Sequence, residues 1–218
     1  MKKKHLNALN SLEKWLSDQK VLTSDLSQAL SLVKSAVQDV IEETSNKELT
    51  LPPPKEIAHQ PSCFALYSDG GCRGNPGPGA FAYLIQNHQG DILGEGVEFE
   101  SLTTNNKMEL MGVIRGLQEL KEVLIQSGGD PLKSEVKVVT DSQYVVNGMK
   151  SWVTGWKARG WKKADKKTPE NLDLWQSLDL IKDSFMKVEW EWVKGHGGHP
   201  QNEYCDQKAN EAMDAHLL

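Results

Sequence analysis

The stretch CFALYSDGGCRGNPGPGAFAYLI, residues 63–85, predicts two antiparallel strands joined by a turn rich in glycine and proline. Its first part, CFALYSD, is a short apolar run that ends in the acid Asp69. A third run, ILGEGVEF, follows at residues 92–99 after the turn-rich segment QNHQGD. Together the three runs predict an antiparallel meander.

Beyond the meander, helical and strand patterns alternate. Residues 105–126 repeat apolar side chains near period 3.6 and stop at a pair of glycines. The run VKVVT predicts a buried strand, and a helix is expected from Ser142. Next, LDLWQSLDLIKDSF predicts a helix, KVEWEWV an edge strand, and residues 201–216 a closing helix. This order predicts an α/β fold, a mixed five-stranded sheet flanked by helices.

Residues 1–50 predict a small α-helical extension of a different character. Two helices, 5–19 and 24–46, would form a hairpin, and Pro52-Pro53-Pro54 marks residues 51–61 as a linker. The second helix has a heptad-like apolar seam formed by Leu26, Leu30, Val33, Val37 and Val40. The seam favours contact with a protein partner, a second copy of the chain or the domain that follows.

Composition indicates a soluble globular protein, with 38% hydrophobic and 25% charged residues among 218. We expect no membrane span, because no apolar run approaches 18 residues. The basic start MKKKH is followed by interrupted apolar residues, which is not a signal-peptide core. Three cysteines form no paired framework and favour a cytoplasmic location.

Residues 150–167 contrast with the net charge of −5 of the whole chain. They hold seven Lys and Arg against the single acid Asp165, a net of +6, and they interleave three tryptophans. A charge run is usually a solvated helix face. Here the contrast with the acidic remainder favours contact with nucleic-acid phosphates.

Four acids lie in four separate motifs: Asp69, Glu109 in TTNNKMELM, Asp141 in VVTDSQY and Asp206 in NEYCDQKAN. Asp69 and Asp141 each end a predicted strand, and ligands collect at neighbouring strand ends. Carboxylates gathered without cations repel one another, and their hard oxygens suit Mg²⁺ or Mn²⁺. For any single acid, an ordinary surface or capping role is the alternative.

The segment VKGHGGHP places His196 among glycines, in a loop where a side chain can move. A solvent-exposed histidine without function is the alternative. His196, His199 and Cys205 could suggest zinc, but a fourth ligand is missing and the spacing fits no common zinc motif. For His199 we expect a structural hydrogen bond.

These motifs, with DSQYV, DLWQ and WEWVKGHGGHP, make residues 62–216 resemble the bacterial type 1 ribonucleases H. The resemblance implies a ribonuclease H catalytic domain over residues 62–218 that cuts the RNA strand of RNA–DNA hybrids. It implies two Mg²⁺ ions, with Mn²⁺ as a substitute. One would activate the attacking water and the other would stabilise the departing 3′ oxygen, leaving 5′-phosphate and 3′-hydroxyl ends. The implied catalytic residues are the metal ligands Asp69, Glu109, Asp141 and Asp206, together with His196 for proton handling or product release.

The resemblance also implies substrate contacts. Those to RNA 2′-hydroxyls and backbone fall on Cys72, Gly74, Asn75, Asn105, Asn106 and Gln143. Those to DNA phosphates fall on Thr104, Trp152, Trp156, Lys157, Arg159, Trp161, Lys162 and Lys163. Helix capping is the alternative for Asn105 and Asn106. Many relatives carry Arg where this chain has Leu102, so Thr104 would be the main anchor of the DNA-phosphate pocket.

Two other functions stay open. The chain could be another nuclease of the same fold, such as a resolvase, although those lack the combination of GNPGPG, TNN, basic tryptophan stretch and GHGGH. It could also bind hybrids without cutting them. A binding module without catalysis is expected to have lost at least one of the four acids, and all four are present.

Overall fold

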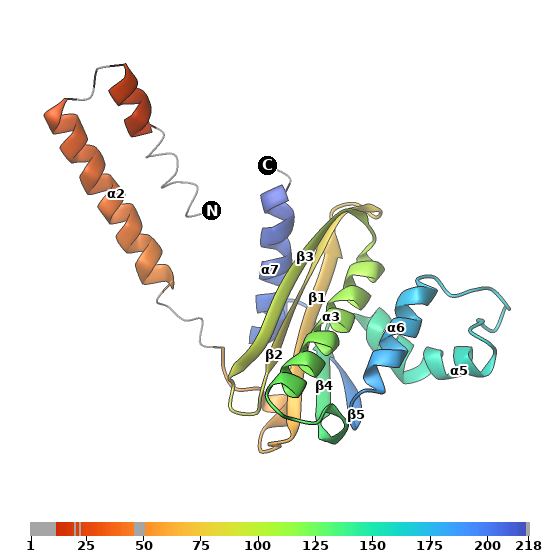
Figure 1. The fold of residues 1–218 in the computed structure, drawn as a ribbon. Coiled ribbons are helices and arrows are strands. Elements are labelled where there is room, and N and C mark those ends of the chain that lie inside the picture. Colours follow the sequence, from red (N-terminus) through yellow and green to blue (C-terminus); the bar gives the residue numbers. More distant parts are fainter. Residues whose placement is uncertain (1–11, 20, 22, 46–50, 217–218) are drawn as a thin grey trace. The chain divides into compact units, whose positions relative to one another are not determined.

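The computed structural model describes residues 12–19, 21, 23–45 and 51–216 (Figure 1). The chain divides into two compact units, residues 1–50 and residues 51–218. No helix among the described residues is both long enough and apolar enough to cross a membrane. The two units are described in turn.

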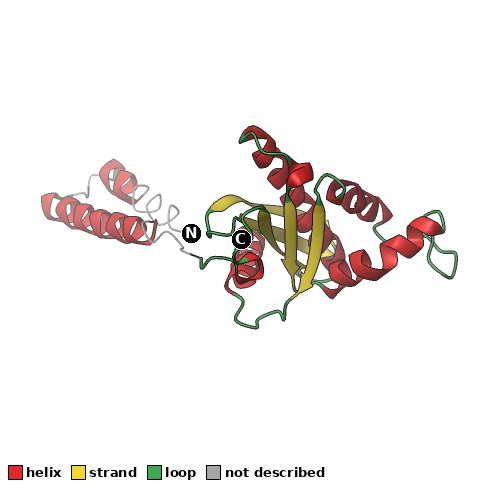
Figure 2. Cartoon of the chain, turned by 90° about the horizontal axis from the view of Figure 1, so that it is seen from below, coloured by secondary structure: helices red, strands yellow, loops and turns green. Residues whose placement is uncertain are grey.

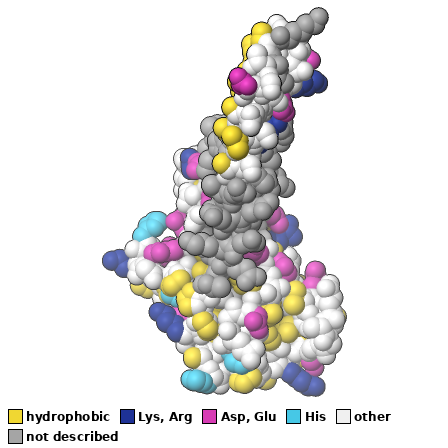
Figure 3. All heavy atoms as spheres, turned by 90° about the vertical axis from the view of Figure 1, so that its left-hand side faces the viewer, with side chains coloured by type: hydrophobic (Ala, Val, Ile, Leu, Met, Phe, Trp, Pro, Cys, Tyr) yellow, Lys and Arg dark blue, Asp and Glu magenta, His cyan; other side chains and the backbone are white. Residues whose placement is uncertain are grey.

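The N-terminal unit contains the two predicted helices. Residues 12–18 are helical, and α2 spans Ser24–Ser45. Predicted helical residues 5–11 and 46 lie outside the described residues. Lys34 of α2 forms an ion pair of 2.5 Å with Glu13, which joins the two helices. Leu30 is buried, whereas other apolar side chains of this unit are exposed (Figure 3), including Trp15, Leu32 and Val33.

The second unit is built on a five-stranded sheet with the order β3-β2-β1-β4-β5. The strands are β1 (Cys63–Cys72), β2 (Gly77–Gln86), β3 (Ile92–Thr103), β4 (Glu135–Thr140) and β5 (Lys187–Trp192). β1, β2 and β3 pair antiparallel, whereas β4 pairs parallel with both β1 and β5. The predicted meander, mixed sheet and edge position of β5 are confirmed.

Helices flank the sheet on both faces (Figure 1, Figure 2). They are α3 (Asn105–Gln126), α4 (Gln143–Asn147), a π-helical turn (Gly148–Trp152), α5 (Val153–Ala158), α6 (Leu172–Lys182) and α7 (Pro200–His216). Short 3-10 turns occur at Lys55–Ile57 and Pro131–Lys133. The α3 helix ends where Gly128 takes a positive φ of 78°, as the sequence predicts.

Two apolar cores lie on the two faces of the sheet. The first packs α3, α6 and the α4–α5 region against one face, with Trp175 fully buried at its centre. Gly148 is needed there, because any side chain would run into the Trp175 ring. The second core packs α7 against the other face. The two cores fix α3 and α7 on opposite sides of β1.

Residues 51–61, predicted as a linker, are part of the second unit. Ile57 is fully buried in the core beside α7, and Pro54 is buried as well. Triple proline sets a stiff backbone but does not decide whether that backbone is solvated or packed. Here the side chain of Ile57, which follows the prolines, is buried in the core beside α7. The compact unit therefore begins at Leu51.

Candidate active site

The strand register brings the first two acids together. Tyr67 of β1 pairs with Val139 of β4 in parallel. Asp69 lies two residues further along β1, and Asp141 lies two residues beyond Val139, directly after the end of β4. Side chains at the same level of adjacent parallel strands share a face, and the strands are about 4.8 Å apart.

Glu109 reaches the same place from α3. Gly70, next to Asp69, permits this close approach because it has no side chain. A Cβ atom at this position would lie only 2.6 Å from the backbone nitrogen of Glu109 and would clash with it. The start of α3 thus rests directly on the β1 backbone. Carboxylate oxygens of Asp69, Glu109 and Asp141 lie within 4.8 Å of one another.

Asp206 completes the set from α7, and all four acids line one cleft of about 310 Å³. The side chain of Asp206 is about one-third exposed, whereas Asp69 and Glu109 are buried. Asn210, one turn further along α7, donates a hydrogen bond of 2.8 Å to its Oδ1 atom. The structure thus gathers all four predicted acids, with Asp206 at the open side.

Burial and mutual repulsion disfavour the charged forms of the three inner acids. Burial, followed by the charges of Asp141 and Asp206, raises the pKa of Asp69 to about 7. Burial, and then Asp69 and Asp141, raises the pKa of Glu109 well above its ordinary value. The pKa of Asp141 is also raised, chiefly by burial, although the Asn202 side chain opposes the shift.

The donor set fits a divalent metal ion. Oε2 of Glu109 is buried and has no hydrogen-bond partner. Such an orphaned acceptor costs free energy unless a cation satisfies it. The three carboxylates have oxygen atoms within 4.8 Å of one another, close enough to bind one ion together. Carboxylate oxygens are the hard ligands that Mg²⁺ and Mn²⁺ prefer.

The glycine loop passes over the acids. Gly195 lies so close to Oδ2 of Asp141 that any side chain there would collide with it. His196 is exposed, and its Nδ1 atom lies 3.8 Å from Oδ2 of Asp206. His199 is instead buried and bonds Glu56 through Nε2 at 2.9 Å, so the predicted structural bond is confirmed. That bond and the exposed position of His196 give no support to a zinc site.

Some of the predicted RNA-contacting residues border the cleft. Cys72 and Asn105 line it. The Asn105 backbone donates to Oδ1 of Asn75 at 3.4 Å, and the Asn105 side chain donates to Glu109 at 3.5 Å. The turn after β1 is thereby joined to the start of α3. Gly74 lies in this turn, whereas Asn106 and Gln143 do not line the cleft.

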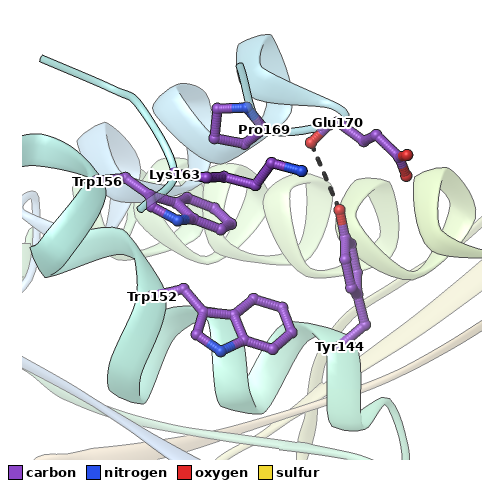
Figure 4. Close-up of a pocket in the computed structure, with 6 residues that line it drawn as sticks. All are labelled: Tyr144, Trp152, Trp156, Lys163, Pro169 and Glu170. Atoms are coloured by element: carbon purple, nitrogen blue, oxygen red, sulfur yellow. Dashed lines mark hydrogen bonds between the residues drawn. The ribbon is translucent and has the colours of Figure 1, made fainter. Parts of the chain in front are cut away.

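Residues 150–167, here called the handle, lie apart from the cleft. Lys163, Trp152 and Trp156 line a separate pocket with Tyr144, Pro169 and Glu170 (Figure 4). Lys157 is paired with the buried Asp179 at 2.6 Å. Lys162 donates to Thr168 at 2.7 Å, and Arg159 donates to the Lys162 carbonyl. Trp161 packs on the first core, and Thr104 is the N-cap residue of α3.

Two polar residues at the site are missed by the sequence analysis. Arg73 lines the cleft and forms an ion pair with Asp214 of α7. Asn202 is buried at the first turn of α7 and interacts with Asp141. Both contacts join segments far apart in the chain, and neither residue type is distinctive in its local stretch. The one local indication of either residue is the place of Arg73 in the glycine-rich turn after Asp69.

Comparison with known proteins agrees with this architecture. The family model described as RNase H matches residues 61–214. Ribonuclease H of Cupriavidus metallidurans is 47% identical over 150 residues, which is 68% of this chain and 93% of that protein. LC9-RNase H1, a type 1 RNase H with the type 2 active-site motif, has a TM-score of 0.59 at 37% identity, covering 71% of this chain and 73% of that one. LC11-RNase H1, solved in complex with an RNA/DNA hybrid, has a TM-score of 0.55 at 29% identity, covering 71% and 99%.

Proposed function

Because the chain belongs to the ribonuclease H family, we propose that it is an endonuclease that hydrolyses the RNA strand of RNA–DNA hybrids. The proposal includes two divalent metal ions, Mg²⁺ with Mn²⁺ as a substitute, and products with 5′-phosphate and 3′-hydroxyl ends. The solved complex of LC11-RNase H1 with an RNA/DNA hybrid supports this choice of substrate.

The observation that carries the proposal is the cleft with four carboxylates from four different elements. Asp69 ends β1, Glu109 lies in α3, Asp141 follows β4 and Asp206 lies in α7. Raised pKa values and an orphaned Glu109 oxygen support a bound cation at this cluster. A binding module without catalysis would have no use for such a cluster.

In the proposed mechanism, bound divalent ions would supply positive charge at the attacking and departing oxygens of the phosphodiester. Asp69, between its neighbours, would contribute to both metal positions, with Glu109 and Asp141 on one side and Asp206 on the other. Glu109 is fixed by the contact of α3 with Gly70. His196 is exposed beside Asp206, and its proposed role is proton handling or product release.

The two strands of the hybrid would contact different surfaces. Cys72 and Asn105 line the cleft, and Asn75 and Gly74 lie in the adjoining turn, where amide groups could meet RNA 2′-hydroxyls. The handle cations would contact DNA phosphates. Thr104, at the start of α3, would anchor one further phosphate, and Leu102 beside it offers no charge to assist.

For the N-terminal unit, residues 1–50, we propose a protein-contact role separate from the chemistry. The exposed Trp15, Leu32 and Val33 support a partner or a second copy rather than nucleic acid. Light scattering of the full chain and of a version starting at Leu51 tests the second copy. Equal monomeric masses would exclude it. The free cysteines support a reducing compartment, the cytoplasm. RNA primers and R-loops are the proposed substrates there.

The activity is tested with a hybrid labelled on its RNA strand, beside single-stranded RNA, duplex RNA and duplex DNA of the same sequence. We expect cleavage of the hybrid alone, dependent on Mg²⁺ and abolished by EDTA, with products that carry 5′-phosphates. A protein that binds the hybrid but leaves it intact in both Mg²⁺ and Mn²⁺ would be a binding module. Cleavage of duplex DNA would instead indicate another nuclease of this fold.

A further inference from the structure

The segment before β1 carries polar contacts that the family match does not include. The match begins at residue 61, whereas Glu56 and Pro52 precede it. The Glu56 side chain is nevertheless only 2% exposed. A carboxylate that deeply buried requires partners, and its partners lie on elements of the active site.

Glu56 bonds two side chains at once. Tyr67 of β1 donates its hydroxyl to Oε2 at 2.8 Å, and Nε2 of His199 lies 2.9 Å from Oε1. Burial by itself would raise the pKa of Glu56, but the bonds from His199 and Tyr67 outweigh it and lower the pKa to about 2. An ionised carboxylate only accepts hydrogen bonds, so Nε2 of His199 carries the donated proton.

A second link lies on the same helical turn. The Gln201 side chain donates to the Pro52 carbonyl at 2.7 Å and to Oε1 of Gln86 at 3.1 Å. Gln201 is buried, so both bonds are shielded from water. His199 and Gln201 thus tie the start of α7 to the segment that precedes β1.

The same turn also carries residues that lie beside the acids. Asn202 interacts with Asp141, and Asp206 follows one turn later. The loop that carries His196 is joined to the same helix, because the Gly198 backbone donates to Glu203 at 2.8 Å. A shift of the first turn of α7 would therefore move Asp206, Asn202 and the His196 loop together.

We propose that Pro52 and Glu56 form a brace that sets the position of the first turn of α7, and that Glu56 is a positioning residue for the active site. The brace bonds His199 and Gln201, while Asn202 on the same turn acts on Asp141 and Asp206 lines the cleft. This inference rests on the proposed function for its effect on cleavage. Its effect on the geometry of the acids is independent of substrate.

The test compares three full-length variants with the wild type. Glu56→Gln keeps the shape of the side chain but removes the charge that His199 meets. Tyr67→Phe removes one hydroxyl from the same carboxylate. Ile57→Val is the matched control, since Ile57 packs in the same core but is not bonded to α7. Thermal unfolding establishes that each variant is folded.

Three quantities are then measured: the backbone amide NMR shifts of residues 195–206, the dissociation constant for Mn²⁺ alone, and kcat and KM for the hybrid. Glu56→Gln should shift those amides, weaken Mn²⁺ binding and lower kcat by about 10-fold with KM nearly unchanged. Tyr67→Phe should do the same to a smaller degree. Ile57→Val should lower the unfolding midpoint and leave all three quantities as in the wild type.

Two results would overturn the brace. One is a folded Glu56→Gln protein whose amide shifts, Mn²⁺ affinity and kcat equal those of the wild type. The other is an equal loss in Ile57→Val and Glu56→Gln, which would make the segment a source of stability only. If the wild type fails to cut any hybrid, the proposed function fails, and the amide shifts and Mn²⁺ affinity still decide the brace.

Discussion

The cleft and the handle differ in whether their charged side chains are paired within the protein. In the cleft, carboxylate oxygens of Asp69, Glu109 and Asp141 lie within 4.8 Å of one another, and no ion pair among the described residues involves these three acids. In the handle, positive side chains already have protein partners: Lys157 is paired with Asp179, and Lys167 lies 3.6 Å from Asp165. One region leaves its charge unbalanced, and the other balances part of it internally.

The difference shows where an external ligand is required. A buried cluster of like charges is stabilised when protons or metal ions neutralise it, so the cleft is compatible with a bound divalent cation. Partly exposed and partly paired cations can exchange an internal partner for a phosphate at little cost. The cleft should therefore control the chemistry, and the handle should adjust affinity.

The largest effect is expected from Asp69→Asn. This change removes a ligand shared by both proposed metal positions, and several kcal/mol of transition-state stabilisation corresponds to about 10³-fold in rate. Steady-state cleavage of the labelled hybrid measures it. Asp173→Asn, at an exposed position of α6, is the control and should cut normally. Retention of more than a tenth of the rate in Asp69→Asn would contradict the metal assignment.

The second prediction concerns how the free energy of unfolding of the metal-free protein changes with pH. The folded pKa of Asp69 is about 7, above the ordinary value of 3.8, so the folded state holds the extra proton between these values. Stability must then fall as pH rises through this window, by about 2 kcal/mol between pH 5.5 and 8. Urea unfolding with EDTA measures the free energy of unfolding.

Two controls sharpen this prediction. Asp69→Asn should flatten the decline and stabilise the metal-free protein at pH 8, and saturating Mg²⁺ should also flatten the decline in the wild type. A metal-free wild type that becomes more stable from pH 5.5 to 8 would mean that the carboxylates do not repel one another as the cleft geometry requires.

The third prediction compares two cations of the handle: Lys163, and Lys157, which is paired with Asp179. Lys163→Ala should raise KM several-fold and reduce the slope of log KM against log salt by about 1, since one phosphate contact is lost. Lys157→Ala should mainly reduce stability, because the buried Asp179 would keep only Lys182 as a partner. Equal salt slopes for both variants and the wild type would remove the handle from substrate binding.

The smallest effect is expected at Leu102, which is 71% exposed and lies two residues before Thr104. Leu102→Arg places a cation beside the N-terminus of α3 and should lower KM about threefold at low salt, with kcat unchanged. Leu102→Gln, which is polar but uncharged, is the matched control. The same KM in both variants would show that no DNA phosphate passes this position.

The sequence predicted those parts of the site that depend on local pattern. Asp69 and Asp141 were predicted at strand ends from the apolar runs before them, and the register of β1 with β4 brings them together. Contacts between distant segments could not be predicted. The Glu56–His199 bond and the Arg73–Asp214 pair depend on how α7 crosses the sheet, and no local pattern in the chain specifies that crossing.

The pairing of Lys157 with Asp179 was missed for the same reason. Counting charges along the chain gave the handle a net of +6, but the count could not include an acid contributed by α6. The sequence predicts a linker for the Pro-rich segment before β1, because proline restricts the backbone. The burial of Ile57 and Pro54 shows that this segment is packed against the sheet domain, which the restricted proline backbone alone does not reveal.

Calorimetric titration of the wild type and Asp69→Asn with Mg²⁺, and with Mn²⁺ in parallel, tests the central claim most directly. The cleft account predicts that the wild type binds the ions, releases protons more strongly at pH 6 than at pH 8, and loses this binding in Asp69→Asn. Identical titrations of the two proteins would contradict it, because the acids would then not be the metal site.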